Sequence, residues 1–189
     1  SAQGATGGSS EPGIVMVSVD VNGNGQPDDP WYELAGSEYG KETTVKDYEI
    51  TYYRPDENKT PEPGTSSSIT DATYVRWTDN QGGTGYISKL TFHKQPYYPQ
   101  WLASETMTFK GTRLADNAID ESGNGSYYVL HAYDWGYADN HPNNSEKSSF
   151  KIDWAVDAAG NPVALPGIDF VKIYTGVNQF NGWLGECST

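Results

Sequence analysis

Most of this 189-residue chain consists of short segments in which apolar and polar residues alternate, with Gly- and Pro-rich turns between them. Alternation with a period of two is typical of half-buried β-strands, and no stretch has the period of a long amphipathic helix. The pattern therefore predicts an all-β fold, a β-sandwich of jelly-roll type with long irregular loops. The expected strands cover residues 14–21, 47–53, 74–77, 86–92, 106–110, 150–156 and 168–175.

Two of these expected strands differ from the others in their apolar faces. Residues 14–21 are almost all β-branched and place Val15, Val17, Val19 and Val21 on one face, as a core strand does. Residues 168–175 are apolar on both faces. Because an apolar run of this length is typical of a strand buried on both sides, we expect residues 168–175 to form a central strand.

The length of the chain suits a single domain, which we place at residues 11–189. Residues 1–10 are rich in Gly and Ser and are predicted to be a flexible linker or a truncated start. Leu, Ile, Val and Phe number only 31, a composition that by itself favours disorder. The 14 Tyr and 6 Trp residues indicate instead a folded domain with an aromatic core, since these side chains bury large areas.

The chain is strongly acidic, with 25 Asp and Glu against 12 Lys and Arg and a formal net charge of −13. Nucleic acids and anionic membrane surfaces are therefore poor partners, whereas metal cations and neutral ligands such as glycans are better ones. No apolar run is long enough to span a membrane, and no signal peptide is visible. The single cysteine, Cys187, excludes an internal disulfide and is interpreted as a packed side chain.

The clearest motif is a loop over residues 20–29 with oxygen-bearing side chains at alternating positions. A Gly at the sixth position supplies the sharp turn that a calcium-binding loop needs. Calcium fits best, because it accepts six to eight oxygen ligands at flexible geometry. The expected ligands are Asp20, Asn22, Asn24, Asp28 and the main-chain carbonyl of Gln26.

The match to a calcium loop is incomplete. Trp31 stands at the twelfth position, where a bidentate acid is expected, so Asp29 or Glu33 would have to take its place. The alternative interpretation is a plain Asn-Gly hairpin turn, because Asn-Gly readily adopts the positive φ of a tight turn.

Other metal candidates are weaker. The three histidines, His93, His131 and His141, are scattered without the spacing of a zinc motif, so surface or capping roles are favoured. A second group of oxygen-bearing side chains is interpreted as an acidic turn rather than another calcium site. It contains Asp116, Asp120, Glu121, Ser122 and Asn124.

Two aromatic segments are candidates for ligand binding. Residues 134–140 combine large rings with acids and an amide, a set that holds sugars by stacking and by hydrogen bonds. The alternative is that these rings plug the end of the sandwich. Residues 95–101 form a second, Pro-bounded patch that either lines the same site or covers the core. The candidate residues are Tyr97, Tyr98, Trp101, Asp134, Trp135, Tyr137, Asp139 and Asn140.

Several longer strings together resemble a family of Bacteroidetes proteins that are described only as cell-surface proteins and are often accompanied by PKD-type modules. The similarity extends over nearly the whole chain from about Ser9. The strings that carry it are residues 10–17, 22–29, 31–38, 93–99, 134–140 and 182–186.

The resemblance implies a β-rich, surface-exposed lipoprotein, and it carries no catalytic residues over to this chain. It also implies that some relatives lie beside outer-membrane uptake systems, including those for corrinoids. The chain departs from the family pattern in two ways. Family members have strand-like sequence before the Ser10–Val17 string, where this chain has Gly and Ser, and Cys187 replaces an expected Thr or Val.

Three functions are compatible with these observations. The first is a non-enzymatic, calcium-stabilised module on a bacterial cell surface, which binds a glycan or another small neutral ligand. The second is a surface component of an outer-membrane nutrient-uptake system that binds a cofactor such as a corrinoid, or another surface protein, across a broad aromatic surface. The third is a polysaccharide hydrolase or lyase, which would need two facing carboxylates; the sequence singles out no such pair.

Overall fold

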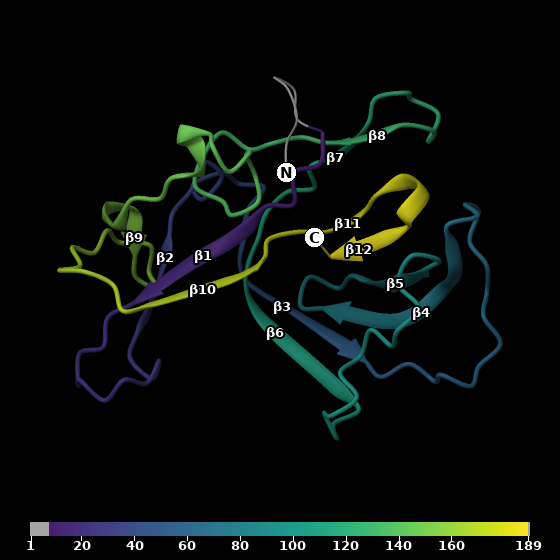
Figure 1. The fold of residues 1–189 in the computed structure, drawn as a ribbon, viewed down its shortest axis with the longest axis horizontal. Coiled ribbons are helices and arrows are strands. Elements are labelled where there is room, and N and C mark those ends of the chain that lie inside the picture. The colour runs from purple at the N-terminus through teal and green to yellow at the C-terminus, as the bar shows by residue number, and fades with distance from the viewer. Residues whose placement is uncertain (1–7, 189) are drawn as a thin grey trace.

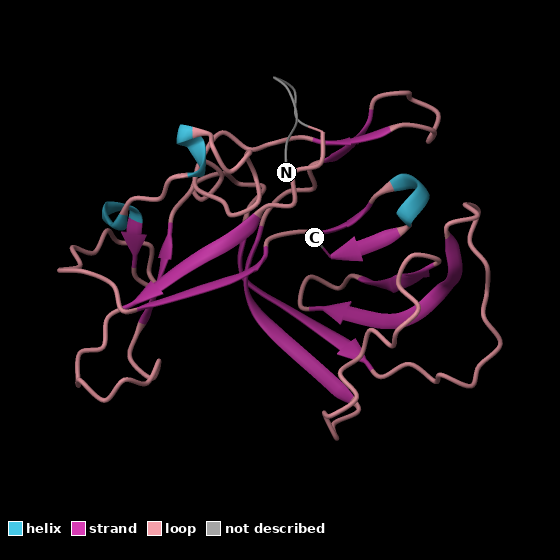
Figure 2. Ribbon diagram, viewed as in Figure 1, coloured by secondary structure: helices cyan, strands magenta, loops and turns pink. Residues whose placement is uncertain are grey.

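Antiparallel β-sheets build the whole fold in the computed structural model, which describes residues 8–188 (Figures 1 and 2). The predicted all-β class is confirmed. Among the described residues, no helix is long and apolar enough to cross a membrane. Three short 3₁₀ turns complete the regular structure: η1 (Glu146–Ser148), η2 (Ile152–Trp154) and η3 (Gly182–Leu184).

Two four-stranded sheets form the two halves of the molecule (Figure 1). The first sheet has the order β10-β1-β2-β9 and the second has the order β5-β4-β3-β6. The first sheet comprises β1 (Gly13–Ser18), β2 (Trp31–Leu34), β9 (Ala155–Val156) and β10 (Phe170–Thr175). The second comprises β3 (Val45–Tyr53), β4 (Ile69–Asp79), β5 (Thr84–Leu90) and β6 (Thr106–Arg113). Two strand pairs lie outside them: β7 (Ala118–Asp120) with β8 (Tyr128–Leu130), and β11 (Asn178–Phe180) with β12 (Glu186–Ser188).

The first sheet is packed on both faces of β1, because apolar residues occupy successive positions of this strand. Ile14 points to one face and packs with Leu114, Tyr137 and Val177. The opposite face carries Val15 and Val17, which pack with Leu34 and Ala155. β1 is therefore the centre of the hydrophobic core in this half.

In the β3–β6 pair of the second sheet, side chains alternate between an apolar and a polar face. In the antiparallel pairing of β3 with β6, Ile50 lies opposite Phe109, and Thr51 lies opposite Thr108. Cross-strand partners share a face, so the Ile50 face is apolar, whereas the Thr51 face is polar and includes the Glu49–Lys110 ion pair at 2.6 Å.

The hairpin β11–β12 covers only part of the apolar face. Glu186 on β12 accepts hydrogen bonds from the Trp77 Nε1 atom and from the backbone N–H of Tyr86, at 3.2 and 2.8 Å. These contacts hold the hairpin against β4 and β5. The part of the face formed by β3 and β6 extends beyond it, and there Phe109 keeps 52 % of its surface exposed.

Several expected strands differ from the structure. β1 ends at Ser18, so residues 19–21 belong to the following loop and Val21 is 76 % exposed. Within residues 150–156, the turn η2 replaces most of the strand, because the backbone N–H of Trp154 bonds to the Lys151 carbonyl and the Trp154 ring packs on Trp135. Within residues 168–175, β10 begins at Phe170 and lies at an edge of its sheet and not in the centre.

Of the expected linker, residues 1–7 lie outside the described residues. Gly8 and Ser10 donate backbone hydrogen bonds to the Leu130 carbonyl at 3.1 and 3.2 Å, and the Ser10 side chain is fully buried. The described part of this segment is therefore attached to the fold beside β8.

Candidate functional site

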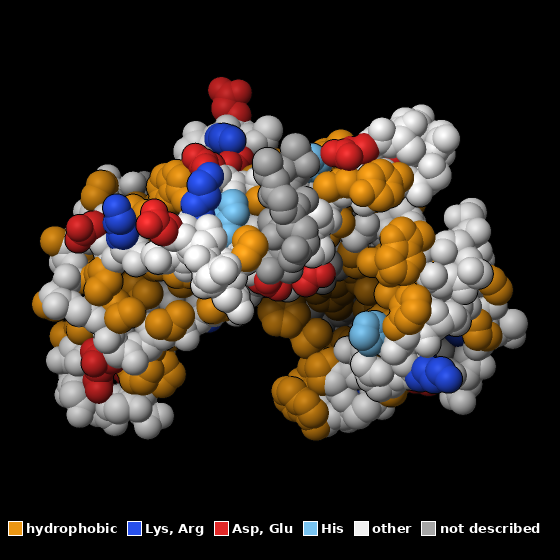
Figure 3. Space-filling model, turned by 45° about the horizontal axis from the view of Figure 1, so that its top comes forward, with side chains coloured by type: hydrophobic (Ala, Val, Ile, Leu, Met, Phe, Trp, Pro, Cys, Tyr) orange, Lys and Arg blue, Asp and Glu red, His pale blue; other side chains and the backbone are white. Residues whose placement is uncertain are grey.

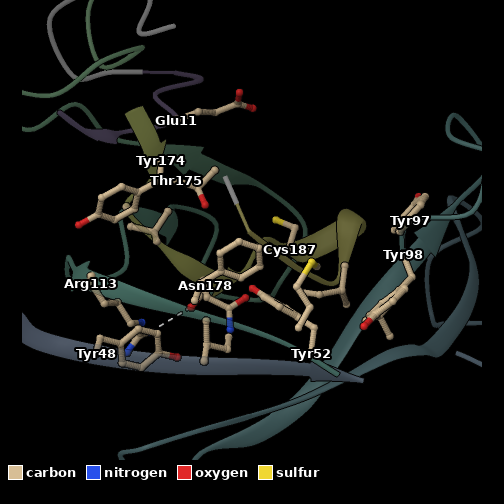
Figure 4. A pocket seen from close by; sticks show the side chains of 18 of the residues that line it. Glu11, Tyr48, Tyr52, Tyr97, Tyr98, Arg113, Tyr174, Thr175, Asn178 and Cys187 are labelled. Carbon is tan, nitrogen blue, oxygen red and sulfur yellow. Dashed lines mark hydrogen bonds between the residues drawn. The ribbon is translucent and has the colours of Figure 1, made fainter. Parts of the chain in front are cut away.

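A cleft of about 870 Å³ lies between the two halves of the molecule. In the space-filling view the molecule is hollowed there, and hydrophobic side chains gather on the wall (Figure 3). Figure 4 shows Tyr174 and Cys187 on one side of the cleft, with Tyr48 and Tyr52 on the opposite side and Tyr98 at one end.

One wall is the apolar face of the second sheet along β3 and β6, where Tyr48 and Ile50 are buried and Phe109 is half exposed. Tyr48, Ile50 and Tyr52 alternate along β3, and Met107 and Phe109 lie beside them on β6. Tyr52 and Phe109 meet edge to face, with ring centroids 6.1 Å apart. Alternation puts all these side chains on one face of the sheet, so the wall is a continuous apolar and aromatic surface.

The opposite wall comes from the end of β10 and from the segment that follows it. The backbone N–H of Leu114 bonds to the Gly176 carbonyl at 2.8 Å, which joins the end of β6 to the end of β10. The Tyr174 hydroxyl accepts a hydrogen bond from the Thr112 backbone N–H at 2.8 Å. A Cβ atom on Gly111 would lie 2.5 Å from that hydroxyl oxygen, so a glycine is needed there for Tyr174 to lie against β6.

The end of the cleft is formed by the loop between β5 and β6. The Tyr97 hydroxyl accepts a hydrogen bond from the Leu90 backbone N–H at 2.9 Å. Tyr98 is buried, donates to the Ser104 carbonyl at 3.0 Å and stacks under the Arg54 guanidinium. The structure thus brings two of the predicted ligand-binding residues to the cleft, in ordered positions.

The third aromatic residue of that segment points elsewhere. Trp101 does not line the cleft, and 85 % of its surface is exposed. An irregular, Pro-bounded loop has no fixed period of side-chain directions. The sequence alone therefore did not show which of its rings reach the cleft.

The predicted segment 134–140 lies in the first half of the molecule, and none of its residues lines the cleft. Tyr137 is buried in the core around Ile14, and its hydroxyl accepts a hydrogen bond from the Glu38 backbone N–H at 3.0 Å. Trp135 packs on Trp154 with ring centroids 4.5 Å apart. Tyr137 is therefore a core residue of the first half, and Trp135 is half-buried against Trp154.

The polar residues of this segment also have local partners. Asn140 is fully buried, and its side chain bonds to both the backbone N–H and the carbonyl of Tyr133, each at 2.8 Å. Asp134 is paired with Lys147, and the ammonium group lowers the pKa of this exposed carboxyl. Asp139 is exposed and adopts a positive φ of 49°, which places it in a turn.

The candidate calcium loop lies between β1 and β2 and folds around its own polar side chains. The Asp20 carboxylate accepts a hydrogen bond from the Gly25 backbone N–H at 2.8 Å. The amide groups of Asn22 and Asn24 both donate to Asp28, at 3.3 and 3.0 Å. The four predicted side-chain ligands therefore converge on one small volume.

Additional acids lie at the base of this loop. Asp29 accepts a hydrogen bond from the Val21 backbone N–H at 3.0 Å, and Asp169, just before β10, accepts one from the Asp20 backbone N–H at 2.8 Å. Asp169 was missed because it is far away in sequence. Gln26 donates its backbone N–H to the Asn24 Oδ1 atom at 2.7 Å, as in a tight turn.

The fit of this loop to calcium depends on amide and carbonyl oxygens. Within residues 8–188, no three His, Cys, Asp or Glu side chains come together in a group that could hold a metal. Calcium accepts such neutral oxygens, and small rotations of the Asn22 and Asn24 amides would turn their oxygens towards the loop centre.

The other titratable candidates are engaged locally. His131 pairs with Glu121 at 2.9 Å, and the His141 ring bonds to the Asp134 carbonyl at 2.9 Å, whereas His93 lies at the cleft. Burial raises the pKa of the Cys187 thiol to about 11, so this cleft residue remains a protonated, weakly nucleophilic thiol at neutral pH.

Comparison with known proteins gives no match to a protein-family model and no match to a curated protein sequence. Function is therefore argued from the geometry of the cleft and of the loops.

Proposed function

We propose that this chain is a non-enzymatic ligand-binding module of a bacterial cell surface, and that the aromatic cleft is its ligand site. The cleft carries the proposal, because its volume of about 870 Å³ lies in the range of sites for small molecules and cofactors. Its wall of Tyr, Phe, Met and Ile side chains offers dispersion and stacking contacts to a large ligand with apolar surface.

Of the functions considered, the cleft favours the surface component of a nutrient-uptake system over a glycan-binding module. Sugar recognition needs hydrogen-bonding groups beside the stacking rings. Polar side chains do line the cleft, among them Gln95, Arg113 and Asn178, but the residues predicted to bind a sugar, Asp134, Asp139 and Asn140, lie elsewhere, and the β3–β6 wall is mainly apolar and aromatic. A corrinoid-like cofactor or a segment of a partner protein matches the broad aromatic wall better.

The cleft gives less support to a hydrolase or lyase. Hydrolysis by paired carboxylates needs two acids facing each other across the substrate. Among the described residues that line the cleft, Glu11 is the only Asp or Glu. Glu33 is part-buried behind the cleft, where it accepts a hydrogen bond from the Thr112 hydroxyl.

The proposal includes calcium as a structural cofactor held by Asp20, Asn22, Asn24, Asp28 and the Gln26 carbonyl. The ion would tie the loop after β1 to the start of β10 through Asp169, which already bonds to the Asp20 backbone. Surface attachment as a lipoprotein, through sequence outside this chain, and a jelly-roll topology remain predictions from the sequence.

The test is isothermal titration calorimetry with cyanocobalamin as a corrinoid probe and with a set of neutral hexasaccharides. We compare the unmodified chain with Phe109→Ala, which removes a ring from the cleft wall, and with Thr108→Ala on the opposite face of β6. Corrinoid binding that weakens about tenfold in Phe109→Ala alone is expected from the loss of one aromatic contact. Hexasaccharide binding that Phe109→Ala leaves unchanged would overturn the assignment of the cleft.

A further inference from the structure

The strand β10 has the sequence of a central strand but the position of an edge strand. Phe170 and Tyr174 point to one face, and Val171 and Ile173 point to the other. Within residues 8–188, β10 pairs with β1 on one side only. Val171 and Ile173 consequently keep 56 % and 58 % of their surfaces exposed.

The backbone of β10 offers hydrogen-bonding groups at its open side. Gly13 exchanges both of its backbone hydrogen bonds with Ala138, and Pro12 accepts one from Gly176 at 2.8 Å. Because antiparallel pairs alternate between bonded and non-bonded positions, residues 12, 14 and 16 of the chain face β10 and residues 13, 15 and 17 face away from it. Val15 lies opposite Ile173 and Val17 opposite Val171. The backbone N–H and C=O groups of Val171 and Ile173 therefore point away from β1, to the free edge.

This edge is also unprotected. Natural edge strands are usually interrupted by bulges or prolines, or carry charges that discourage pairing. The register of β10 with β1 runs without a bulge from Gly13–Thr175 to Ser18–Phe170. Lys172 is the only charged residue within β10.

The edge opens onto the cleft. Ile173 and Tyr174 line it from β10, and β6 lines it from the other side. β6 is likewise an edge strand of its own sheet. The two strands meet at the Leu114–Gly176 hydrogen bond and diverge from there, which leaves a wedge between the halves (Figure 1).

We propose that the free edge of β10 binds an extended polypeptide strand with alternating apolar side chains, which adds to the first sheet and lays those side chains in the cleft. This inference rests on the proposed role of the cleft as the ligand site, and it names the class of ligand. A strand bonds to outward N–H and C=O groups that repeat every second residue, about 6.8 Å apart, which neither a corrinoid nor a glycan does. Acidic residues flanking the strand would complement Lys172 on β10 and Arg113 at the end of β6, which outnumber the one acid of the cleft, Glu11.

The probe is a fluorescently labelled synthetic peptide in which three Val residues alternate with Thr, with two Glu residues at each end. Its control has the same sequence with N-methyl groups on the amides of one edge, which removes the hydrogen-bond donors but keeps the side chains. Fluorescence anisotropy measures both against the full chain. We expect the control to bind at least about tenfold more weakly, because several backbone hydrogen bonds are lost.

Two substitutions at one position separate backbone from side-chain contributions. Ile173→Ala removes the apolar side chain and keeps the outward N–H, whereas Ile173→Pro also removes that N–H and leaves the bonds to β1 in place. We expect Ile173→Ala to weaken peptide binding a few-fold and Ile173→Pro to weaken it about tenfold further. Urea unfolding of each variant verifies that it is folded, and the N-methylated peptide tests the same bonds on the unmodified chain.

The outcomes distinguish this inference from the proposed function. Equal binding of the two peptides overturns strand addition, and if Phe109→Ala still weakens binding, the cleft remains the ligand site. Corrinoid binding in the cleft without peptide binding would likewise overturn strand addition and leave the cleft as the ligand site. Sedimentation showing that Ile173→Pro abolishes a dimer of the unmodified chain would identify a second copy as the occupant and overturn the inference. Failure of every probe to respond to Phe109→Ala contradicts the proposed function itself.

Discussion

The first and second sheets distribute and bury their apolar side chains differently. In the first sheet, β1 is packed on both faces, by Ile14 on one side and by Val15 and Val17 on the other. In the second sheet, one face is polar, and the apolar face buries Tyr48, Ile50 and Trp77 but leaves Phe109 on β6 52 % exposed. The comparison indicates that each half has a buried core and that the second half also presents a half-exposed apolar wall for binding.

The largest expected effect comes from truncating equivalent apolar side chains in the two halves. Ile14 is 1 % exposed, so Ile14→Ala should cost about 3 kcal/mol of unfolding free energy through lost burial and the cavity left behind. Phe109 is half exposed, and Phe109→Ala should cost less than about 1 kcal/mol. Urea unfolding followed by circular dichroism measures both values. Equal losses would show that the wall around Phe109 is packed in solution and would remove the distinction between the halves.

The next effect concerns the segment 134–140, which sequence reasoning treated as a candidate ligand site. Asn140→Ala should cost about 2 kcal/mol, because the backbone N–H and carbonyl of Tyr133 lose their buried partners. Asp134→Ala, at an exposed position of the same segment, is the control and should change stability little, because it removes only an exposed ion pair with Lys147. Differential scanning calorimetry measures both variants. If Asn140→Ala leaves stability unchanged but abolishes hexasaccharide binding, this segment is a glycan site after all.

The strands were predictable where alternation was long. The expected segments 47–53 and 106–110 coincide with β3 and β6, since each has enough residues to show a period of two. Short strands such as β7, β8 and β11 have three residues each, too few for any pattern. The expected strand at 150–156 failed because η2 turns the chain after Lys151.

The candidate site was only partly predictable, for a related reason. Alternation showed that Tyr48, Ile50 and Tyr52 share a face, but it did not show whether another sheet covers that face. The sequence analysis therefore did not mark Phe109, which is half exposed beside the buried Tyr48 and Ile50, as part of a binding surface. Composition likewise marked residues 134–140 as a binding loop, although the structure packs Tyr137 against Ile14. Whether another element covers a sheet face depends on tertiary packing, which a local sequence pattern does not predict.

Calcium should have a smaller effect, and it should act through the first half alone. Two separate loops contain the same type of turn. The Gly25 backbone N–H donates to the Asp20 carboxylate at 2.8 Å, and the Gly125 backbone N–H donates to the Asp120 carboxylate at 2.7 Å. The first loop has further acids at its closing end and base, Asp28 and Asp169, whereas the second continues into Ser126 and Tyr127. Calcium at ten times its dissociation constant should add about 1.4 kcal/mol to the unfolding free energy.

Thermal unfolding in calcium and then in excess EGTA tests this difference. Asp20→Ala should abolish the calcium-dependent rise in the midpoint, and Asp120→Ala, the matched control, should leave it intact. A rise that survives Asp20→Ala but not Asp120→Ala would reverse the assignment. If calcium does not raise the unfolding midpoint of the unmodified chain, residues 20–29 are a plain hairpin turn and not a calcium site.

The smallest expected effect is a pH dependence of opposite sign in the two sheets. Burial raises the pKa of Glu33 on β2 above its ordinary 4.5, against the opposing influence of the Thr112 hydrogen bond and of Lys46. Burial also acts to raise the pKa of Asp71 on β4, but hydrogen bonds from Lys59 and from backbone N–H groups outweigh it and hold this pKa below 3.8. One carboxyl group therefore favours its neutral form in the folded state, and the other favours its charged form.

These opposite shifts determine how each group contributes to stability. The contribution of Glu33 is fully present below its unfolded pKa and is lost as pH rises through its raised folded pKa, so Glu33→Gln should become increasingly favourable towards neutral pH. The contribution of Asp71 is present above its unfolded pKa and is lost as pH falls through its lowered folded pKa, so Asp71→Asn should be most damaging at neutral pH and less damaging in acid. Urea midpoints of the three proteins between about pH 3 and pH 7 give the two slopes. Slopes of the same sign would mean that the carboxyl group of Glu33 has access to water, and that the first half is less tightly closed around β2 than its packing indicates.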